Sequence, residues 1–171
     1  MPYLDDKMHM RGTLDNDEVY MREALELAKK AFSLGEAPVG AVVVKKSTGE
    51  IIGRGYNLRE SGKSPLAHAE IMALDEASRT LGGWRVVDSV LYVTLEPCPM
   101  CAGAIINSRI DRVVFGASDP KAGCAGSIVN LFEMGFNHKP EVAAGVLGDE
   151  CAGLLSEFFR GLREKRKERG K

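Results

Sequence analysis

Apolar residues recur at helical spacing in some segments of this chain and form short continuous runs in others, which predicts alternating helices and strands. The first helix is expected to begin at about residue 15, where three consecutive residues of cap-forming type precede the repeat, and to end at Gly35. Its apolar positions recur at helical spacing, at Met21, Leu25, Ala28 and Phe32. Residues 1–14 show no such repeat, so we expect a mobile N-terminal leader followed by a single domain over residues 15–171.

Five largely apolar runs predict the strands of one sheet. They lie at residues 39–44, 51–56, 90–95, 110–117 and 142–146. The first two flank a polar loop with Gly49 near its end, which indicates a hairpin. Helices are expected at residues 67–81, after residue 99, at 127–134 and at the C-terminal end of the chain. Strands that alternate with helices predict an α/β sheet with helices on both faces.

Length and composition place the chain among ordinary globular proteins. It has 171 residues, of which 44% are hydrophobic and 27% charged, enough for one domain with a substantial core. No apolar stretch approaches the roughly 20 residues needed to cross a bilayer. The N-terminus also lacks the apolar segment of a secretion signal. We therefore expect a cytoplasmic protein with no membrane partner.

Charge is unevenly distributed along the chain. The net charge is only −1, but residues 160–171 contain seven basic and two acidic residues. A basic C-terminal helix of this kind suits contact with phosphate groups. It equally suits a solvated helix end, where cations compensate the helix dipole. The charge pattern alone favours the second interpretation.

Two short motifs place three metal-ligating side chains and one carboxylate at predicted helix starts. His68 and Glu70 begin the helix at 67–81, and Cys98 and Cys101 follow the strand at 90–95. One imidazole and two thiolates are ligands that zinc prefers, and three protein ligands leave the fourth position open to water, as in catalytic sites. Strand ends and helix starts meet at one edge of an α/β sheet, so we expect both motifs there.

This ligand set predicts a hydrolytic centre. Bound zinc lowers the pKa of water from about 15.7 to roughly 7, and Glu70, two residues after His68, is placed to move protons rather than to act as a fourth ligand. A structural zinc site closed by Cys124, Cys151 or His138 is an alternative, as is a redox pair of cysteines. Outside a metal site, Cys124 and Cys151 are expected to be packed or free thiols.

The spacing H-x-E…P-C-x-x-C is that of the zinc-dependent nucleobase deaminases. Beyond this motif, the chain resembles the bacterial tRNA-specific adenosine deaminases from about Asp17 to Arg166. The segments that carry the resemblance are Ala37–Ala41, Gly55–Asn57, Ala67–Ala73, Leu91–Cys98, Met100–Ala104, Arg112–Ala117, Phe136–His138 and Phe158–Arg160.

The resemblance implies a three-layer α/β/α cytidine-deaminase-like fold around a five-stranded mixed sheet, a homodimer, and one Zn²⁺ per chain. It implies conversion of the wobble adenosine in a tRNA anticodon stem-loop to inosine, with His68, Cys98 and Cys101 as zinc ligands and Glu70 as the catalytic proton shuttle. The remaining implied roles concern substrate binding. Asn57, the backbone of Ala69, and Val39 would surround the flipped base, and neighbouring nucleotides would meet Asp119, Lys121, Asn137, His138, Phe159 and Arg160.

Several of these residues have a simpler interpretation. Asn57 and Asp119 are also typical turn residues, and His138 could be an ordinary loop histidine. Phe158 and Phe159 cannot both face the core from one helix, so one of them is expected at a surface. The pair Pro99-Met100 also occurs in guanine deaminases, so the zinc motif leaves a deaminase of free guanine or another base open, and a non-enzymatic zinc-stapled module is a further alternative. The segments around Asp119 and Phe159 favour tRNA.

Overall fold

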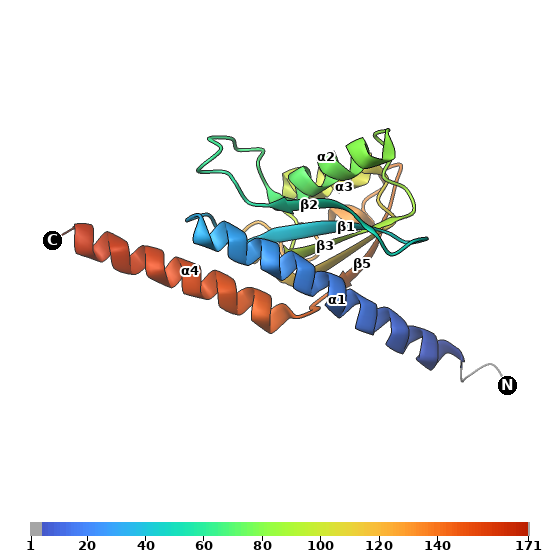
Figure 1. Ribbon diagram of the computed structural model, residues 1–171, viewed down its shortest axis with the longest axis horizontal. Helices are drawn as coiled ribbons and strands as arrows, with labels where there is room; N and C mark the ends of the chain where they lie inside the picture. The colour runs from blue at the N-terminus through green and yellow to red at the C-terminus, as the bar shows by residue number, and fades with distance from the viewer. Residues whose placement is uncertain (1–4, 171) are drawn as a thin grey trace.

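A five-stranded mixed sheet forms the centre of the protein (Figure 1). The computed structural model describes residues 5–170, and side chains from residue 16 onward. The strands lie in the order β2-β1-β3-β4-β5, with β1 antiparallel to β2 and β3, and with β3, β4 and β5 parallel to one another. Their bounds are β1 (Gly40–Lys45), β2 (Ile51–Tyr56), β3 (Ser89–Leu95), β4 (Arg112–Ala117) and β5 (Glu141–Ala144).

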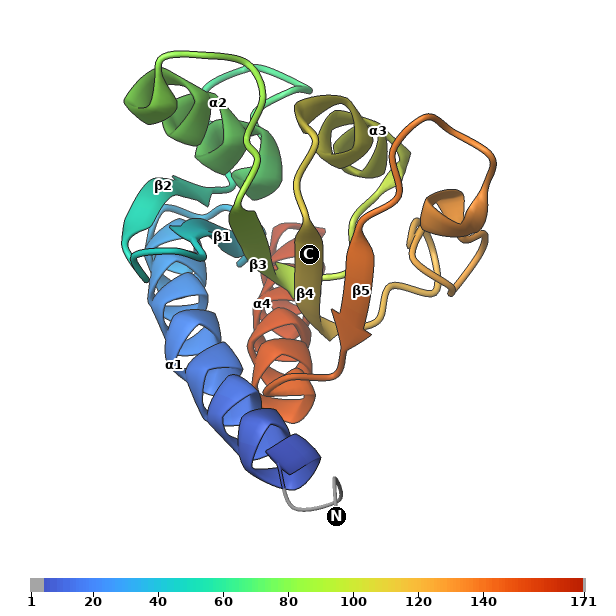
Figure 2. The same ribbon diagram turned by 90° about the vertical axis from the view of Figure 1, so that its right-hand side faces the viewer.

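Helices cover both faces of the sheet, which confirms the predicted three-layer α/β/α architecture. The helices are α1 (Asp5–Ser33), α2 (Ala69–Leu81), α3 (Pro99–Ser108) and α4 (Gly148–Arg169), with a short 3-10 turn η1 (Leu131–Glu133). Figure 2 shows α2 and α3 above one face and α1 and α4 below the other. None of the helices in the described residues is both long and apolar enough to span a membrane.

Burial on both faces explains why the strands are continuous apolar runs rather than alternating ones. In β1, Ala41 and Val43 belong to the core between the sheet and α2 and α3. Val42 and Val44 belong to the second core, between the sheet and α1 and α4. Both sides of this strand therefore contribute to a core.

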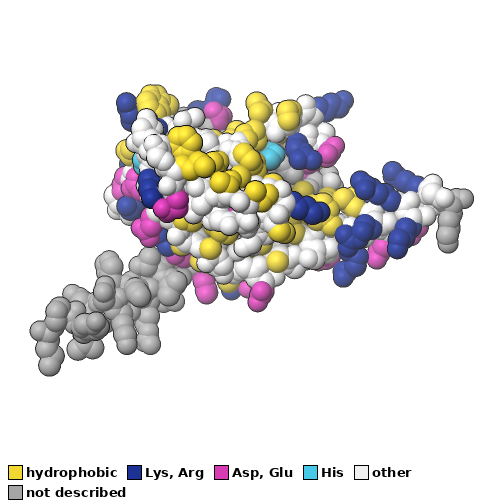
Figure 3. Space-filling model, turned by 180° about the vertical axis from the view of Figure 1, so that it is seen from behind, with side chains coloured by type: hydrophobic (Ala, Val, Ile, Leu, Met, Phe, Trp, Pro, Cys, Tyr) yellow, Lys and Arg dark blue, Asp and Glu magenta, His cyan; other side chains and the backbone are white. Residues whose placement is uncertain are grey.

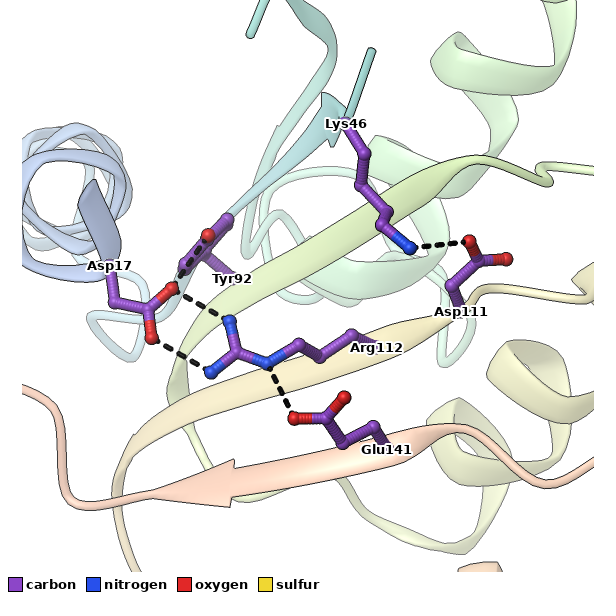
Figure 4. A network of polar contacts seen from close by, with 6 residues as sticks. All are labelled: Asp17, Lys46, Tyr92, Asp111, Arg112 and Glu141. Carbon is purple, nitrogen blue, oxygen red and sulfur yellow. Dashed lines mark hydrogen bonds and ion pairs between the residues drawn. The ribbon is translucent and has the colours of Figure 1, made fainter. Parts of the chain in front are cut away.

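The first helix begins at Asp5, ten residues before the start expected from the sequence. The expected start misjudges Asp17, which does not cap the helix. Asp17 lies within α1, and its carboxylate points toward the sheet, where it accepts hydrogen bonds from Tyr92 and from both terminal nitrogens of Arg112 (Figure 4). Part of the predicted mobile leader, residues 1–4, lies outside the described residues, and the mobility of residues 1–14 stays a prediction.

The prediction of a helix at 127–134 is wrong, because only the single 3-10 turn η1 forms there. The backbone N–H of Ser127 donates to the Glu96 carboxylate, and Ala125 forms an isolated bridge with Asn130. These contacts hold the segment in a loop until Asn130, whose side chain caps η1 by accepting from the Phe132 N–H. Tertiary contacts thus override the local helical pattern.

Two glycines of β2 let α2 lie directly against the sheet. A Cβ at Gly55 would overlap the carbonyl oxygen of Ala69, and a Cβ at Gly53 would overlap that of Ala73. Glycine is the residue that permits such close approach of two backbones. The contact at Gly55 fixes the first turn of α2, which follows His68, against the end of the sheet.

Candidate active site

The metal-ligating side chains come from two helix starts at one edge of the sheet. His68 is the N-cap residue of α2, Cys98 is the N-cap residue of α3, and Cys101 lies in the first turn of α3. Both thiol sulfurs lie close to His68 Nδ1, at 3.6 Å for Cys98 and 3.5 Å for Cys101. In the part of the chain that the structure describes, these three residues form the cluster that could hold a metal ion, with their ligand atoms within 4.8 Å of one another.

The three donors fit a zinc ion. Tetrahedral zinc, with bonds of about 2.3 Å to sulfur and about 2.0 Å to nitrogen, separates sulfur from nitrogen by about 3.5 Å. The two observed distances between sulfur and Nδ1 match this value. The proposed closing ligands Cys124, Cys151 and His138 are not members of the group. The site therefore has the three-ligand pattern of a catalytic zinc centre.

The sulfur atoms also have the electrostatics of a cation site. A hydrogen bond from Cys101, assisted by His68, lowers the pKa of Cys98 to about 4. The neighbouring Cys98 sulfur in turn raises the pKa of Cys101. Two sulfurs this close compete for one negative charge, and a divalent cation between them is what allows both to be thiolates.

Glu70 lies beside the donors and is not one of them. Its side chain is buried, with 4% of the residue exposed. Burial raises the pKa of Glu70 to about 7. A carboxyl group with such a pKa can both accept and donate a proton near neutral pH, although the charge of a bound cation would oppose the rise. The proton-transfer role expected of Glu70 from the sequence stays a prediction.

A cavity of about 190 Å³ opens at the donors. This volume lies below the range of about 300–1,000 Å³ that is usual for drug-sized ligands, so the cavity suits a small group such as one base. The residues that line it include His68, Glu70 and Cys98, the three residues predicted to surround the base (Val39, Asn57 and Ala69), and Asp119, which is predicted to meet a neighbouring nucleotide. Arg59 also lines it, although no sequence motif points to this residue.

A larger groove of about 710 Å³ continues from this cavity toward α4, and the two share Val39 and Asp119. Lys121 and Phe159, both predicted site residues, line the groove, and so do Arg163 and Arg166. Figure 3 shows Lys and Arg side chains gathered along the projecting C-terminal helix. The two arginines are not among the predicted site residues, although their spacing from Phe159 places all three on one side of a helix.

Other predicted contacts lie apart from the cavity. His138 Nε2 bonds to the carbonyl oxygen of Ile110, next to the start of β4, and Asn137 precedes it on an exposed loop. The cavity lies beyond the other end of β4, at Asp119. Arg160 is exposed on α4 and does not line the groove. The roles of these three residues in binding RNA stay predictions.

The two phenylalanines of α4 divide as expected. Phe158 is buried and packs edge-on against Phe32, with ring centroids 5.5 Å apart. Phe159 is 44% exposed and lines the groove. The Asp119 carboxylate accepts from the backbone N–H groups of Lys121 and Ala122, so this residue also forms the turn that its sequence context suggests.

Relatives of this chain include tRNA-specific adenosine deaminases from two bacteria. The profile of the cytidine and deoxycytidylate deaminase zinc-binding region matches residues 14–117. The tRNA-specific adenosine deaminase of Bacillus subtilis is 55% identical over 155 residues, which cover 90% of this chain and 95% of that protein. The Haemophilus influenzae protein of the same name is 53% identical over 152 residues, covering 88% of this chain and 87% of its own length.

Solved structures agree with the sequence comparison. A structure from work on tRNA deaminases that edit adenosine to inosine at the wobble position has a TM-score of 0.76 and 40% identity, covering 79% of this chain and 97% of its own. The guanine deaminase of Nitrosomonas europaea has a TM-score of 0.68 and 26% identity, covering 82% and 83%. With the zinc-type site in the matched region, the chain belongs to the tRNA-specific adenosine deaminase family of the cytidine and deoxycytidylate deaminases.

Proposed function

We propose that this protein hydrolyses the exocyclic amine of the wobble adenosine in a tRNA anticodon, releasing ammonia and leaving inosine. The observation that carries this proposal is the His68, Cys98 and Cys101 group, with Glu70 beside it, in a small cavity that opens onto a basic groove. The names of the relatives support the substrate. Zinc held by the three donors would supply an activated water at neutral pH.

Glu70 performs the proton transfers in this proposal. It accepts a proton from the attacking water and donates it to the ring nitrogen next to the carbon that carries the amine. The water oxygen bonds to that carbon, and Glu70 passes the second proton of the water to the amine, which leaves as ammonia. Glu70 is buried beside the metal donors, and this burial raises its pKa, whereas the charge of a bound cation would lower it again.

The base itself would be held by three other residues that line the cavity. Asn57 ends the β2 region with only 9% of its surface exposed, and its side chain offers both a donor and an acceptor for the ring. Ala69 lies in the first turn of α2, where backbone N–H groups have no partner within the helix. Val39 supplies an apolar surface for the ring. A base in an anticodon loop is single-stranded, which minimises the unstacking cost of drawing it into such a cavity.

The groove along α4 would hold the nucleotides next to the target. Lys121, Arg163 and Arg166 offer cations for phosphates, and Phe159 offers an exposed ring for stacking. Arg160 lies next to Phe159 at the surface and could reach the same strand. Asn137 and His138 lie apart from the cavity and the groove, next to the start of β4, so their contact with RNA would involve nucleotides farther from the target.

A homodimer is the second part of the proposal. Large apolar side chains are exposed in the segments that flank α2 and η1, and isolated proteins rarely leave many of them uncovered together. They are Leu66, Trp84, Ile128, Met134 and Phe136. Sedimentation at micromolar concentration should give twice the mass of one chain, and a monomer would contradict this part.

The test of the activity is incubation with a synthetic anticodon stem-loop bearing adenosine at the first anticodon position, followed by detection of inosine. Glu70→Ala should lose a factor of at least about 10²–10⁴ in rate while keeping its zinc. Asp75→Ala is the matched control, because Asp75 is an acidic residue of the same helix that pairs with Arg79 at the surface. Inosine formation by Glu70→Ala at the wild-type rate would refute the role of Glu70.

The likeness to the guanine deaminase of Nitrosomonas europaea makes free guanine a second candidate substrate. The zinc motif does not separate the two, but the groove of α4 extends well beyond the volume needed for one base. Ammonia release from guanine, with no inosine formed in the stem-loop, would favour this second candidate.

A further inference from the structure

Glu96 lies between β3 and the metal-ligating turn, and one loop supplies the donors that bond its buried carboxylate. Only 2% of the residue is exposed. Its oxygens accept hydrogen bonds from three backbone N–H groups, those of Asp119 at 2.9 Å, Ala125 at 2.9 Å and Ser127 at 3.0 Å. The Ser127 hydroxyl donates a further, short bond. The donors come from both ends of residues 119–127, so one side chain holds the two ends of this loop together.

The loop is shaped closely around this carboxylate. A Cβ on Gly123 would overlap the carboxyl group of Glu96, so this position has no room for a side chain. The backbone N–H of Cys124 also donates to the carbonyl oxygen of Pro97 at 2.9 Å. An ionised carboxylate that accepts several N–H bonds is among the stronger hydrogen-bonding arrangements in proteins. The loop therefore follows the position of Glu96 and Pro97.

The same loop forms part of the cavity and the groove. Asp119 and Ala122 line the cavity together with Glu96 itself, and Asp119 and Lys121 line the groove. Two residues after Glu96 stands Cys98, a member of the metal-donor group. Glu96 thus connects the turn that holds the metal to the loop that faces the substrate.

We propose that Glu96 is a positioning residue, whose carboxylate fixes the 119–127 loop as the substrate-facing side of the cavity. This proposal rests on the proposed function and names a residue that determines acceptance of the target nucleotide. The metal donors lie at the starts of α2 and α3, and none of them belongs to the loop. Loss of the carboxylate should therefore weaken substrate binding and leave metal binding and proton transfer intact.

The direct test is Glu96→Gln, which keeps the size of the side chain and one acceptor oxygen. The amide NH₂ of the glutamine is a donor, and it would face backbone N–H groups that are also donors. At least one of the hydrogen bonds that the carboxylate accepts is therefore lost. We expect KM for the anticodon stem-loop to rise at least about tenfold, the factor for one lost bond to a charged group, with kcat within about threefold of wild type. Zinc content should stay at about one per chain.

The matched control is Asp17→Asn. Asp17 is equally buried, at 1% exposed, but its partners Tyr92 and Arg112 lie on the α1 side of the sheet, away from the cavity. This variant should lose stability without a change in KM. If Glu96 acted only through stability, both variants would show the same kinetic pattern.

Ser127→Ala provides a second test that does not depend on the folding of Glu96→Gln. It removes one donor to the carboxylate and should raise KM in the same direction by a smaller factor. Each variant is also combined with Glu70→Ala, which blocks the reaction, and the Kd for the stem-loop is measured. This Kd should rise in step with KM, because it reports binding without chemistry.

The positioning role is supported if Glu96→Gln shows a raised KM and Kd with unchanged kcat and zinc content. If Glu96→Gln does not fold, the same result in Ser127→Ala supports it. Wild-type KM, a fall in kcat together with zinc, or an equal KM change in Asp17→Asn overturns it. A wild-type protein that forms no inosine would instead contradict the proposed function.

Discussion

Gly55→Ala would separate α2 from the sheet at the turn that follows His68. A Cβ at Gly55 would lie 2.7 Å from the backbone nitrogen of Ala73 and still closer to the carbonyl oxygen of Ala69. A carbon and a carbonyl oxygen normally approach to about 3.3–3.6 Å. Because the opposing atoms are helix backbone, the clash can be relieved only if α2 and β2 move apart, at the turn that follows His68.

The size of the effect follows from this geometry. Adding a methyl group to a closely packed site costs typically about 1–3 kcal/mol, and more where backbone must move. For a chain of this length, each kcal/mol lowers Tm by about 2–4 °C. Displacement of His68 should also weaken zinc binding, because the ligand atoms must stay within a few tenths of an ångström of their tetrahedral positions.

Two measurements on purified protein test this prediction. Thermal unfolding should show the loss of stability, and competition with a chromophoric chelator should show weaker zinc binding. Gly53→Ala is the control, because its Cβ would meet the same helix one turn later, 2.9 Å from the backbone nitrogen of Ala77. It should lower Tm by a similar amount with a smaller loss of zinc affinity. Wild-type zinc affinity in Gly55→Ala would refute the inference that β2 positions His68.

Four further predictions address the site, the groove and the fold. Cys98→Ser should sharply lower zinc content, measured by elemental analysis. Truncation after Leu162 should weaken stem-loop binding and flatten its salt dependence, by roughly 0.7–0.9 in slope for each lost phosphate contact, whereas an unchanged slope would make the tail a solvated helix end. Asp17→Asn should lower stability by up to about 3–5 kcal/mol in chemical unfolding, since it removes the negative charge that pairs with the largely buried Arg112. Burial raises the pKa of Glu36, but hydrogen bonds from Ser61 and Glu60 and the charge of Arg59 outweigh burial and lower the pKa below its ordinary 4.5. The ionised carboxylate therefore stabilises the fold above that pH, and this stabilisation is lost as the pH falls below it. In acid unfolding, Glu36→Gln should lack this pH-dependent loss of stability.

Local patterns carried most of what the sequence could predict. The metal donors lie at helix starts within short motifs, so His68, Cys98 and Cys101 could be identified from the order of residues alone. The strands could be located because burial on both faces makes them continuous apolar runs. These features depend on residues that are close in sequence or on a single period.

Features that depend on distant partners could not be predicted. Asp17 looked like a helix cap because its partner Arg112 is 95 positions away. The helix expected at 127–134 fails because Ser127 is tied to Glu96, 31 positions earlier. Arg163 lines the groove because α4 and residues 118–121 form its walls together. These two segments are far apart in the sequence, so no local pattern predicts this arrangement.

X-ray absorption at the zinc edge of the purified wild-type protein measures the first coordination shell of the metal and so tests the catalytic centre most directly. We predict two sulfur atoms at about 2.3 Å and two lighter atoms at about 2.0 Å, one of them the nitrogen of His68 and the other an exchangeable water. A third sulfur at bonding distance, which only Cys124 or Cys151 could supply, or a shell without sulfur, would contradict an open zinc site held by His68, Cys98 and Cys101.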